Sequence, residues 1–448
     1  MEKIPVDYQG FNRYSRLERP LSLERTLFYL TSAAWLLGPA ISVEVESFHL
    51  FPFRILIPAL ILLFAVKASF KRRTKPSLAT NVIKHFGFFG FWLFYAAMST
   101  IWAVDKASAL KDIIFLFTGV SVAFFTAYYL RSLGQLEKLR DIWIIGLVSM
   151  LALGLWEINT GNHLPFSSYV IYDQNKPSAV FYNTNDLAFF IALCLPFIIV
   201  WILSKRHLLQ RLFFMTLLAA AVFVLAKTTS RAAQLGLLAA TAFDLVILRK
   251  ISGKARLLAT AGLLILAFVI LFPQQTREIT EELGRKYSNL PREFEPGSAR
   301  LAVATGVPKL MLISYGMGVG AGNSDHYLHL AGIDYMTGFT ALHNWWLEIL
   351  ANYGIIIFVG YVIFYLSLFF GLLRAYRWIQ DRSTKRLYEA ILMGMVAFPI
   401  ACNAVSSAMA LPQNWMFLGF ALALLNYSRL LRSELHHSHI LRPDGSKI

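Results

Sequence analysis

Residues 186–203 read DLAFFIALCLPFIIVWIL, and this stretch decides the class of fold. It carries no charge after Asp186, and its length is close to the roughly 20 apolar residues that a helix needs to cross a bilayer. Similar runs recur along the whole 448-residue chain, which is 57% hydrophobic and only 15% charged. Soluble domains carry about a quarter charged residues. We therefore expect an all-α integral membrane protein whose helices are solvated by lipid.

The apolar runs predict about twelve transmembrane helices in a single polytopic domain, residues 1–448. One large loop, residues 273–353, separates the ninth and tenth spans and is expected to contain short interfacial helices, because its apolar stretch at 301–313 is too short to span. The predicted spans are 26–43, 51–66, 86–103, 110–130, 142–157, 186–203, 212–226, 232–248, 257–272, 354–373, 388–408 and 415–431.

The basic residues are distributed unevenly between the two sides that these spans define. The net charge is +16, and with a cytoplasmic N-terminus nearly all basic clusters fall in cytoplasmic segments. The opposite loop 44–50 carries Glu44 and Glu46 but no Lys or Arg. This positive-inside pattern predicts cytoplasmic N- and C-termini and an extracytoplasmic loop 273–353. It explains the positive net charge, so nucleic-acid binding is not needed to account for it. The clusters are Lys71-Arg72-Arg73, Lys205-Arg206, Arg249-Lys250 and Lys385-Arg386.

Metal and cofactor binding are not expected from the residue types present. Cys194 and Cys402 both lie inside apolar runs, which argues against a disulfide or a thiolate metal site. The predicted outer segments contain no cluster of metal-ligand residues.

The first candidate site is the segment 227–231 (KTTSR) between two predicted spans. Ser230 and Arg231 lie at the start of a helix, where backbone N–H groups and a guanidinium both favour an anion. The alternative is an arginine that extends to lipid phosphate, and the spacing does not decide between the two.

Two further candidates lie in the large loop. Arg300 precedes the short apolar stretch and is expected near the membrane surface, where an arginine is more often a lipid anchor than a ligand clamp. The glycine run 316–322 is followed by Asn323, and it is similar to a phosphate-binding loop but lacks a surrounding βαβ unit. Gly320 and Gly322 are therefore expected to form a tight turn or to let the backbone approach a bulky polar ligand.

The last two candidates begin predicted spans. In the stretch 343–348 (HNWWLE), His343 is a candidate general base, because imidazole titrates near neutral pH, although a lone histidine is usually structural. Asn344 and Trp345 accompany it, with an interfacial belt as the ordinary explanation of the tryptophan. In the stretch 181–186 (FYNTND), capping of the next helix by Asn185 or Asp186 is the ordinary explanation, and Asn183 is the third candidate ligand.

Taken in order, these segments resemble the O-antigen ligase and polymerase superfamily of bacterial membrane glycosyltransferases. The resemblance covers roughly residues 150–375, and Ile357 departs from the family pattern, which often has Gly, Thr or Tyr there. The matching elements are 181–188 (FYNTNDLA), Thr229-Ser230-Arg231 before an apolar helix, Arg300 followed by 315–323 (YGMGVGAGN), and His343-Asn344 followed after nine residues by Gly354.

The resemblance implies transfer of a glycan from an undecaprenyl-diphosphate carrier to a saccharide or lipid-linked acceptor, outside the bacterial cytoplasmic membrane. It implies an inverting, metal-independent reaction, with His343 as base and Arg231 and Arg300 on the diphosphate. Asn183, Asn185, Asp186, Ser230, Gly320, Gly322, Asn323, Asn344 and Trp345 would then contact substrate. Expected partners are the two glycans, the bilayer and polysaccharide-assembly proteins.

Four functions remain open at this stage. The stretch 156–167 (WEINTGNHLPFS) favours a polymerase of an anionic cell-wall polysaccharide or exopolysaccharide over an O-antigen ligase that acts on lipid A core. A lipid-linked oligosaccharide flippase would need charges inside the bundle, where only Arg54 and Asp244 are predicted. A non-catalytic assembly protein would keep Arg231, Arg300 and His343 apart, whereas an enzyme should bring them to one cavity.

Overall fold

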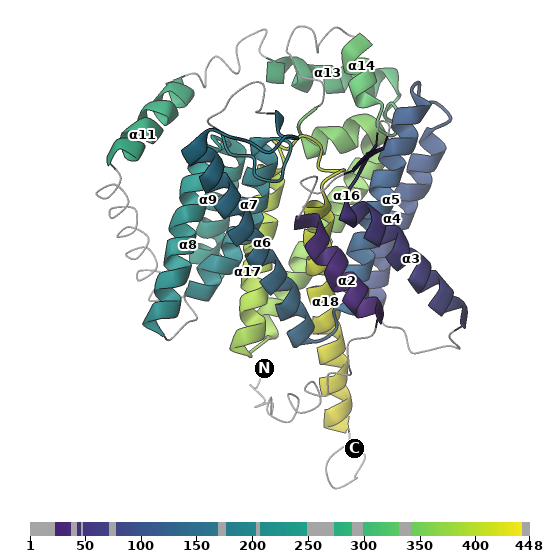
Figure 1. Cartoon of the computed structure of the whole chain (residues 1–448). Helices are drawn as coiled ribbons and strands as arrows, with labels where there is room; N and C mark the ends of the chain where they lie inside the picture. The colour runs from purple at the N-terminus through teal and green to yellow at the C-terminus, as the bar shows by residue number, and fades with distance from the viewer. Residues whose placement is uncertain are drawn as a thin grey trace.

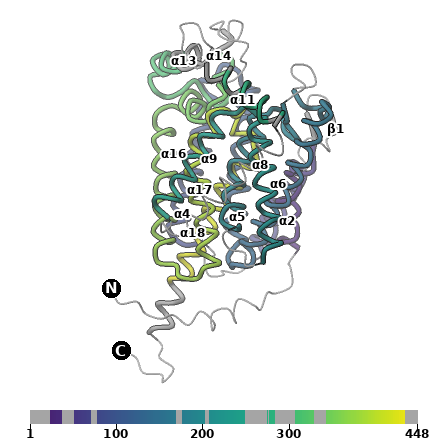
Figure 2. Tube along the Cα trace, turned by 90° about the vertical axis from the view of Figure 1, so that its left-hand side faces the viewer, coloured from purple at the N-terminus to yellow at the C-terminus, as the bar shows by residue number. Residues whose placement is uncertain are grey.

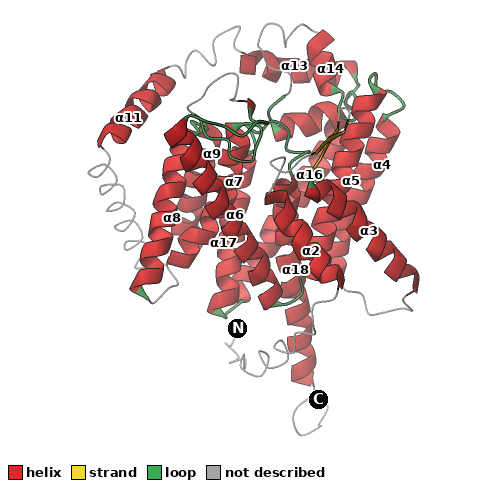
Figure 3. Ribbon diagram, in the orientation of Figure 1, coloured by secondary structure: helices red, strands yellow, loops and turns green. Residues whose placement is uncertain are grey.

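The computed structural model describes residues 23–36, 43–45, 48–70, 78–168, 176–202, 207–248, 273–288, 299–330 and 342–440. These residues form a bundle of helices joined by loops at its two ends, with one short antiparallel hairpin (Figures 1 and 3). The hairpin pairs β1 (Val43–Val45) with β2 (Phe48–Leu50). The helices are α2 (Leu23–Ala34), α3 (Pro52–Phe70), α4 (Thr80–Ser99), α5 (Lys106–Tyr129), α6 (Leu133–Thr160), α7 (Thr184–Ile202), α8 (Leu208–Lys227), α9 (Arg231–Phe243) with its π-helical end η3 (Asp244–Leu248), α11 (Pro273–Ser288), α13 (Ala299–Ile313), α14 (Ser324–Leu330), α16 (Trp345–Trp378), α17 (Arg382–Ala401) and α18 (Pro412–Ile440).

The chain is a multi-pass membrane protein. Seven of the described helices are long and apolar enough to cross a bilayer: α3, α5, α6, α7, α8, the continuous helix α9–η3, and α16. Helices α2, α4, α17 and α18 overlap four more of the predicted spans. The predicted span 257–272 lies outside the described residues, so the total of about twelve stays a prediction.

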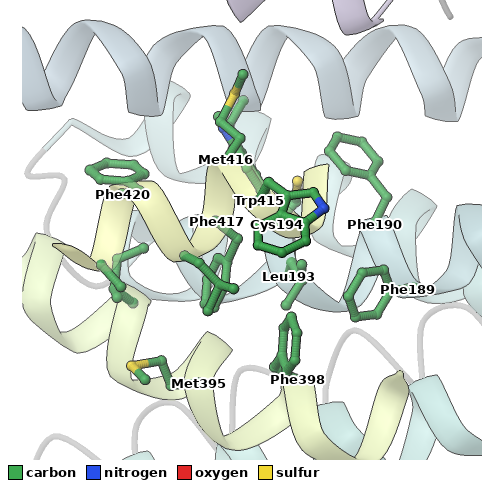
Figure 4. Packing of buried hydrophobic residues seen from close by; sticks show 14 of the residues in the cluster. Phe189, Phe190, Leu193, Cys194, Met395, Phe398, Trp415, Met416, Phe417 and Phe420 are labelled. Atoms are coloured by element: carbon green, nitrogen blue, oxygen red, sulfur yellow. The ribbon is translucent and has the colours of Figure 1, made fainter. Parts of the chain in front are cut away.

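Helix α7 forms the centre of the bundle. It is apolar on every face and buried along almost its whole length, as expected for a helix that neighbouring helices surround. Helix α17 packs against both α7 and α9. The ring centroid of Phe398 on α17 lies 5.6 Å from that of Phe189 on α7 and 6.0 Å from that of Phe417 on α18 (Figure 4). Van der Waals packing of this kind joins helices that share a lipid solvent.

The helices α11, α13 and α14 lie over one end of the bundle, which we call the loop end (Figures 1 and 2). The predicted short helices of the large loop are thus present in its described part. Lys227 at the end of α8 forms an ion pair with Glu278 of α11, with 3.4 Å between Nζ and Oε2. Basic side chains, including Arg374, Arg386 and Arg432, lie near the opposite end, where they line two small pockets.

Helix α16 is broken at Gly354, whose φ of 75° and ψ of −174° are not helical. The predicted span starts at this residue, and the structure adds a short helix ahead of it. The glycine run packs into the break: Val319 N donates to Ala351 O at 2.9 Å, and Ile355 N donates to Gly316 O at 2.9 Å. A Cβ on Gly354 would lie 2.2 Å from Gly316 O, so this contact of two backbones requires glycine.

A stability prediction follows from the α9–α17 contact. A Cβ at Gly236 would lie 2.8 Å from the carbonyl oxygen of Ala397, so Gly236→Ala should push the two helices apart. We expect a loss of about 1–3 kcal/mol, measured as a lower thermal unfolding midpoint of the purified protein. Gly90→Ala is the matched control, because a Cβ there meets nothing within 4 Å. Equal midpoints for the two variants would contradict the close α9–α17 contact.

Candidate active site

A cavity of about 630 Å³ opens at the loop end of the bundle. This is within the size range of pockets that bind small organic ligands. Its walls come from the starts of α3, α5 and α7, from α14, from the short helix ahead of Gly354, and from the segment between α17 and α18. Residues far apart in the sequence thus meet in one polar space at the end of an otherwise apolar bundle.

His343 lines this cavity and has an unusual backbone conformation. Its φ is 49°, a left-handed value that non-glycine residues adopt rarely and mostly at constrained or functional positions. The next residue, Asn344, caps α16: its Oδ1 accepts hydrogen bonds from Trp346 N at 3.0 Å and Leu347 N at 3.2 Å. The cap fixes where the helix begins, and it therefore fixes the backbone position from which the His343 side chain reaches the cavity wall.

Carboxylates held by hydroxyl groups form much of the polar wall. Glu348 Oε1 accepts from Ser407 Oγ at 2.7 Å. Asp186 accepts from Ser406 N at 3.0 Å and from Ser406 Oγ at 2.7 Å. Asp112 accepts from the Tyr353 hydroxyl. Such oxygens are natural acceptors for the hydroxyl groups of a polar ligand such as a sugar.

Two cations line the cavity beside one aromatic ring. The guanidinium carbon of Arg54 lies 5.6 Å from the centroid of Phe115, and Lys111 Nζ lies 6.0 Å from the same centroid. Arg54 also lies 4.6 Å from the centroid of Phe51. These distances correspond to cation–π contacts, and both side chains carry a positive charge at the cavity wall.

The loop between α6 and α7 is fastened to α6 by Glu157. Its Oε2 accepts from Ser178 N at 2.7 Å and from Ala179 N at 2.8 Å. Its Oε1 lies 3.1 Å from His163 Nδ1, and both side chains are almost completely buried. This anchor positions Val180, Phe181 and Tyr182, which line the cavity.

The structure brings His343, Asp186 and Gly322 of the predicted site residues to this cavity. Arg231 is not among the lining residues; it lies at the start of α9, after the buried Ser230. Arg300 lies in α13, but its side chain falls outside the described residues. A common cavity for the two arginines and His343 therefore remains a prediction.

The other predicted ligands have structural roles in this state of the protein. The cap of α7 is Asn183 rather than Asn185 or Asp186: its Oδ1 accepts from Asn185 N at 2.8 Å and Asp186 N at 3.1 Å. Gly320 packs against Ser99 and Ala103. Trp345 is completely buried, with its rings near those of Trp92, Trp415 and Tyr361, and is no interfacial belt residue.

Asn323 joins the glycine run to the start of α5. Its Oδ1 accepts from Asp105 N at 2.8 Å, and its Nδ2 donates to Asp105 O at 3.0 Å. Asp105 in turn caps α5, and hydrogen bonds from the Ser108 hydroxyl and backbone hold the pKa of its carboxyl below the ordinary value. The amide of Asn323 thus bonds the backbone in this structure, and its contact with substrate stays a prediction.

Sequence reasoning missed Lys111, Ser406, Ser407 and Asp325 as cavity residues. Arg54 was noticed as a charge inside a predicted span, which is the signal that could have identified it as functional. Ser406 and Ser407 carry no such signal in the sequence, because only folding brings the turn after α17 beside α7 and α16. No group of three or more His, Cys, Asp or Glu side chains in the described part of the chain is placed to hold a metal ion.

Comparison with known proteins gives two findings. Residues 216–362 match a family described as O-antigen ligase. The chain is also 28% identical over 353 residues to the teichuronic acid biosynthesis protein TuaE of Bacillus subtilis (strain 168), a match that covers 77% of this chain and 72% of that protein. The family match contains Arg231, Arg300, His343 and the glycine run.

The anchoring role of Glu157 gives a prediction for the site. Glu157→Gln replaces one of two acceptor oxygens by an NH₂ donor that faces backbone N–H groups, so we expect a loss of about 1–3 kcal/mol and a loosened cavity wall. Thermal unfolding and proteolysis between α6 and α7 measure the two effects. Glu278→Gln is the control, since its carboxylate is 67% exposed and an exposed ion pair contributes about 0–1 kcal/mol. Equal behaviour of the two variants would refute the anchor.

Proposed function

We propose, from the match of residues 216–362 to the O-antigen ligase family, that this membrane protein is a member of that family and a glycosyltransferase that uses lipid-linked glycans. It transfers a glycan from an undecaprenyl-diphosphate carrier to a saccharide acceptor at the loop end of the bundle. The observation that carries the proposal is the position of His343, held by a helix cap in a cavity lined with hydroxyl and carboxylate groups. Such a cavity suits sugar hydroxyls.

In the proposed reaction a hydroxyl oxygen of the acceptor attacks the anomeric carbon of the donor glycan. The bond between that carbon and the diphosphate oxygen breaks, and undecaprenyl diphosphate leaves with the electron pair. The hydroxyl proton passes to the neutral imidazole of His343, which acts as general base. Attack opposite to the leaving group inverts the anomeric centre, and no metal is required.

Charge that develops on the leaving diphosphate needs cations or dipoles at its oxygens. Arg231 at the N-terminus of α9 combines a guanidinium with helix N–H groups, which supports its assignment to the donor diphosphate. Arg300 begins α13, in the helical layer over the same end of the bundle. We assign it to the same diphosphate, because a planar guanidinium can bind two phosphate oxygens at once.

We favour a polymerase of a cell-wall polysaccharide over an O-antigen ligase. The support is the similarity to a protein named for teichuronic acid biosynthesis. We further propose that the loop end is extracytoplasmic and that both termini are cytoplasmic. The basic side chains near the opposite end, such as Arg374 and Arg386, support this orientation.

Replacement of His343 tests the proposed chemistry. We expect His343→Ala to leave thermal unfolding nearly unchanged while it lowers transfer from a purified undecaprenyl-diphosphate glycan at least about a hundredfold, the usual effect of losing a general base. Product formation is measured with a labelled donor. His326→Ala serves as control, because that histidine on α14 is not among the cavity's described lining residues. Full turnover by the His343 variant would reject its role as base.

A further inference from the structure

A narrow apolar fissure leads from the cavity along the bundle between α3 and α5. We call it the α3/α5 fissure; its volume is about 170 Å³. It shares Phe51, Arg54 and Phe115 with the cavity, together with the turn at Ala410 and Pro412, so the two spaces adjoin. Its remaining walls are Phe53, Pro58, Ile114, Thr118, Gly119, Val122, Met409 and Trp415.

The fissure is long and runs into the apolar depth of the bundle. Its wall on α5 extends from Ile114 to Val122, and at 1.5 Å per residue this is about 12 Å. Helix α3 is inclined to α4 and α5 (Figure 1). Gly119 leaves room for the Trp415 ring, because a Cβ there would lie 2.3 Å from the indole. Apart from Arg54 at its mouth, the fissure has the walls expected for a hydrocarbon chain.

Two cations stand where the fissure meets the cavity. Arg54 lines both spaces, and Lys111 approaches the same Phe115 ring from the cavity side. The carboxylates of Asp112 and Asp325 also line the cavity near Lys111, and Asp112 accepts a hydrogen bond from the Tyr353 hydroxyl. A phosphate group at this mouth would have Arg54 and Lys111 as its cationic neighbours, with polar space on one side and apolar space on the other.

We propose that the α3/α5 fissure holds the first isoprene units of the lipid-linked acceptor, with the acceptor's diphosphate at Arg54 and Lys111. One narrow apolar channel, two cations and a polar cavity of about 630 Å³ fit the diphosphate end of such a ligand, with the start of one hydrocarbon chain on one side and a large glycan head on the other.

The assignment to the acceptor rests on the proposed function. There the donor diphosphate is assigned to Arg231 at the start of α9, and Figure 1 shows α9 on the opposite flank of the bundle from α3 and α5. Two lipid-linked glycans would enter from the two flanks and meet at His343. The new bond joins the donor's anomeric carbon to an acceptor hydroxyl, and the acceptor keeps its own diphosphate and chain.

The test is photocrosslinking of the full-length protein in nanodiscs with undecaprenyl diphosphate that carries a photoreactive group in its isoprenoid chain. Peptides from α3 and α5 should be labelled. Arg54→Gln combined with Lys111→Gln should reduce this labelling at least about tenfold, because both charge-assisted contacts are lost. Thr118→Trp should reduce it similarly, since the indole fills the fissure. Phe117→Trp is the matched control on the outer face of α5, where Phe117 is 48% exposed, and should change labelling less than about twofold.

Two results would overturn the proposal: no labelling of α3 or α5, or equal competition by excess phosphatidylglycerol, which would make the fissure an ordinary phospholipid site. The charge variants and Thr118→Trp test the site in different ways, so if one variant fails to fold, the other still decides the result.

Crosslinking is performed on the His343→Ala background and needs no turnover. If wild-type protein fails to join glycans but α3 and α5 are labelled, the proposed function fails and the binding site stands; polymer formation without such labelling refutes the fissure alone.

Discussion

The contact of the glycine run with the break in α16 determines the geometry of the loop end. At Gly354 the backbone of α16 is not helical. The amides of Val319, Gly320 and Ile355 form hydrogen bonds across the break, which replace helical bonds that would otherwise be lost in an apolar environment. The break separates a membrane-crossing helix from a short one that carries Glu348 and follows His343. This contact and the hydrogen bonds from Trp345 N to Cys402 O and from Trp346 Nε1 to Pro399 O fix the direction of the short helix relative to the cavity.

Buried polar groups at this end hold one another in place. Glu157 fastens the loop before α7, Asp186 fastens the turn after α17, and Asn323 fastens the glycine run to the start of α5. Each bond joins segments far apart in the sequence. Because an unpaired polar group costs about 2–7 kcal/mol away from water, these pairings favour one arrangement of the loops. A fixed arrangement suits the positioning of the two substrates in the proposed reaction.

Hydropathy alone predicted the all-helical membrane fold, because long apolar runs leave few alternatives in a bilayer. The short apolar stretch at 301–313 also predicted a helix in the large loop. Asp186, Gly322 and His343 were identified as site candidates and do line the cavity. The sequence could not reveal that the Asn323 amide bonds the Asp105 backbone, or that the Trp345 indole lies among other aromatic rings, and contact of these two residues with substrate stays a prediction.

The cations Arg54 and Lys111 illustrate the opposite limit. Arg54 stands out in the sequence as a charge inside a predicted span, whereas Lys111 does not, and only packing around Phe115 shows that they share one place. The cavity wall thus includes residues from α3 and α5, which lie outside the segment 216–362 that carries the family match.

The central claim is that this protein joins lipid-linked glycans to each other. The most direct test incubates the purified wild-type protein with one defined undecaprenyl-diphosphate glycan. Separation of the products by size should give a ladder of longer glycans, with one undecaprenyl diphosphate released for every new bond. Unchanged starting glycan, or glycan that has only crossed the bilayer intact, would contradict the account.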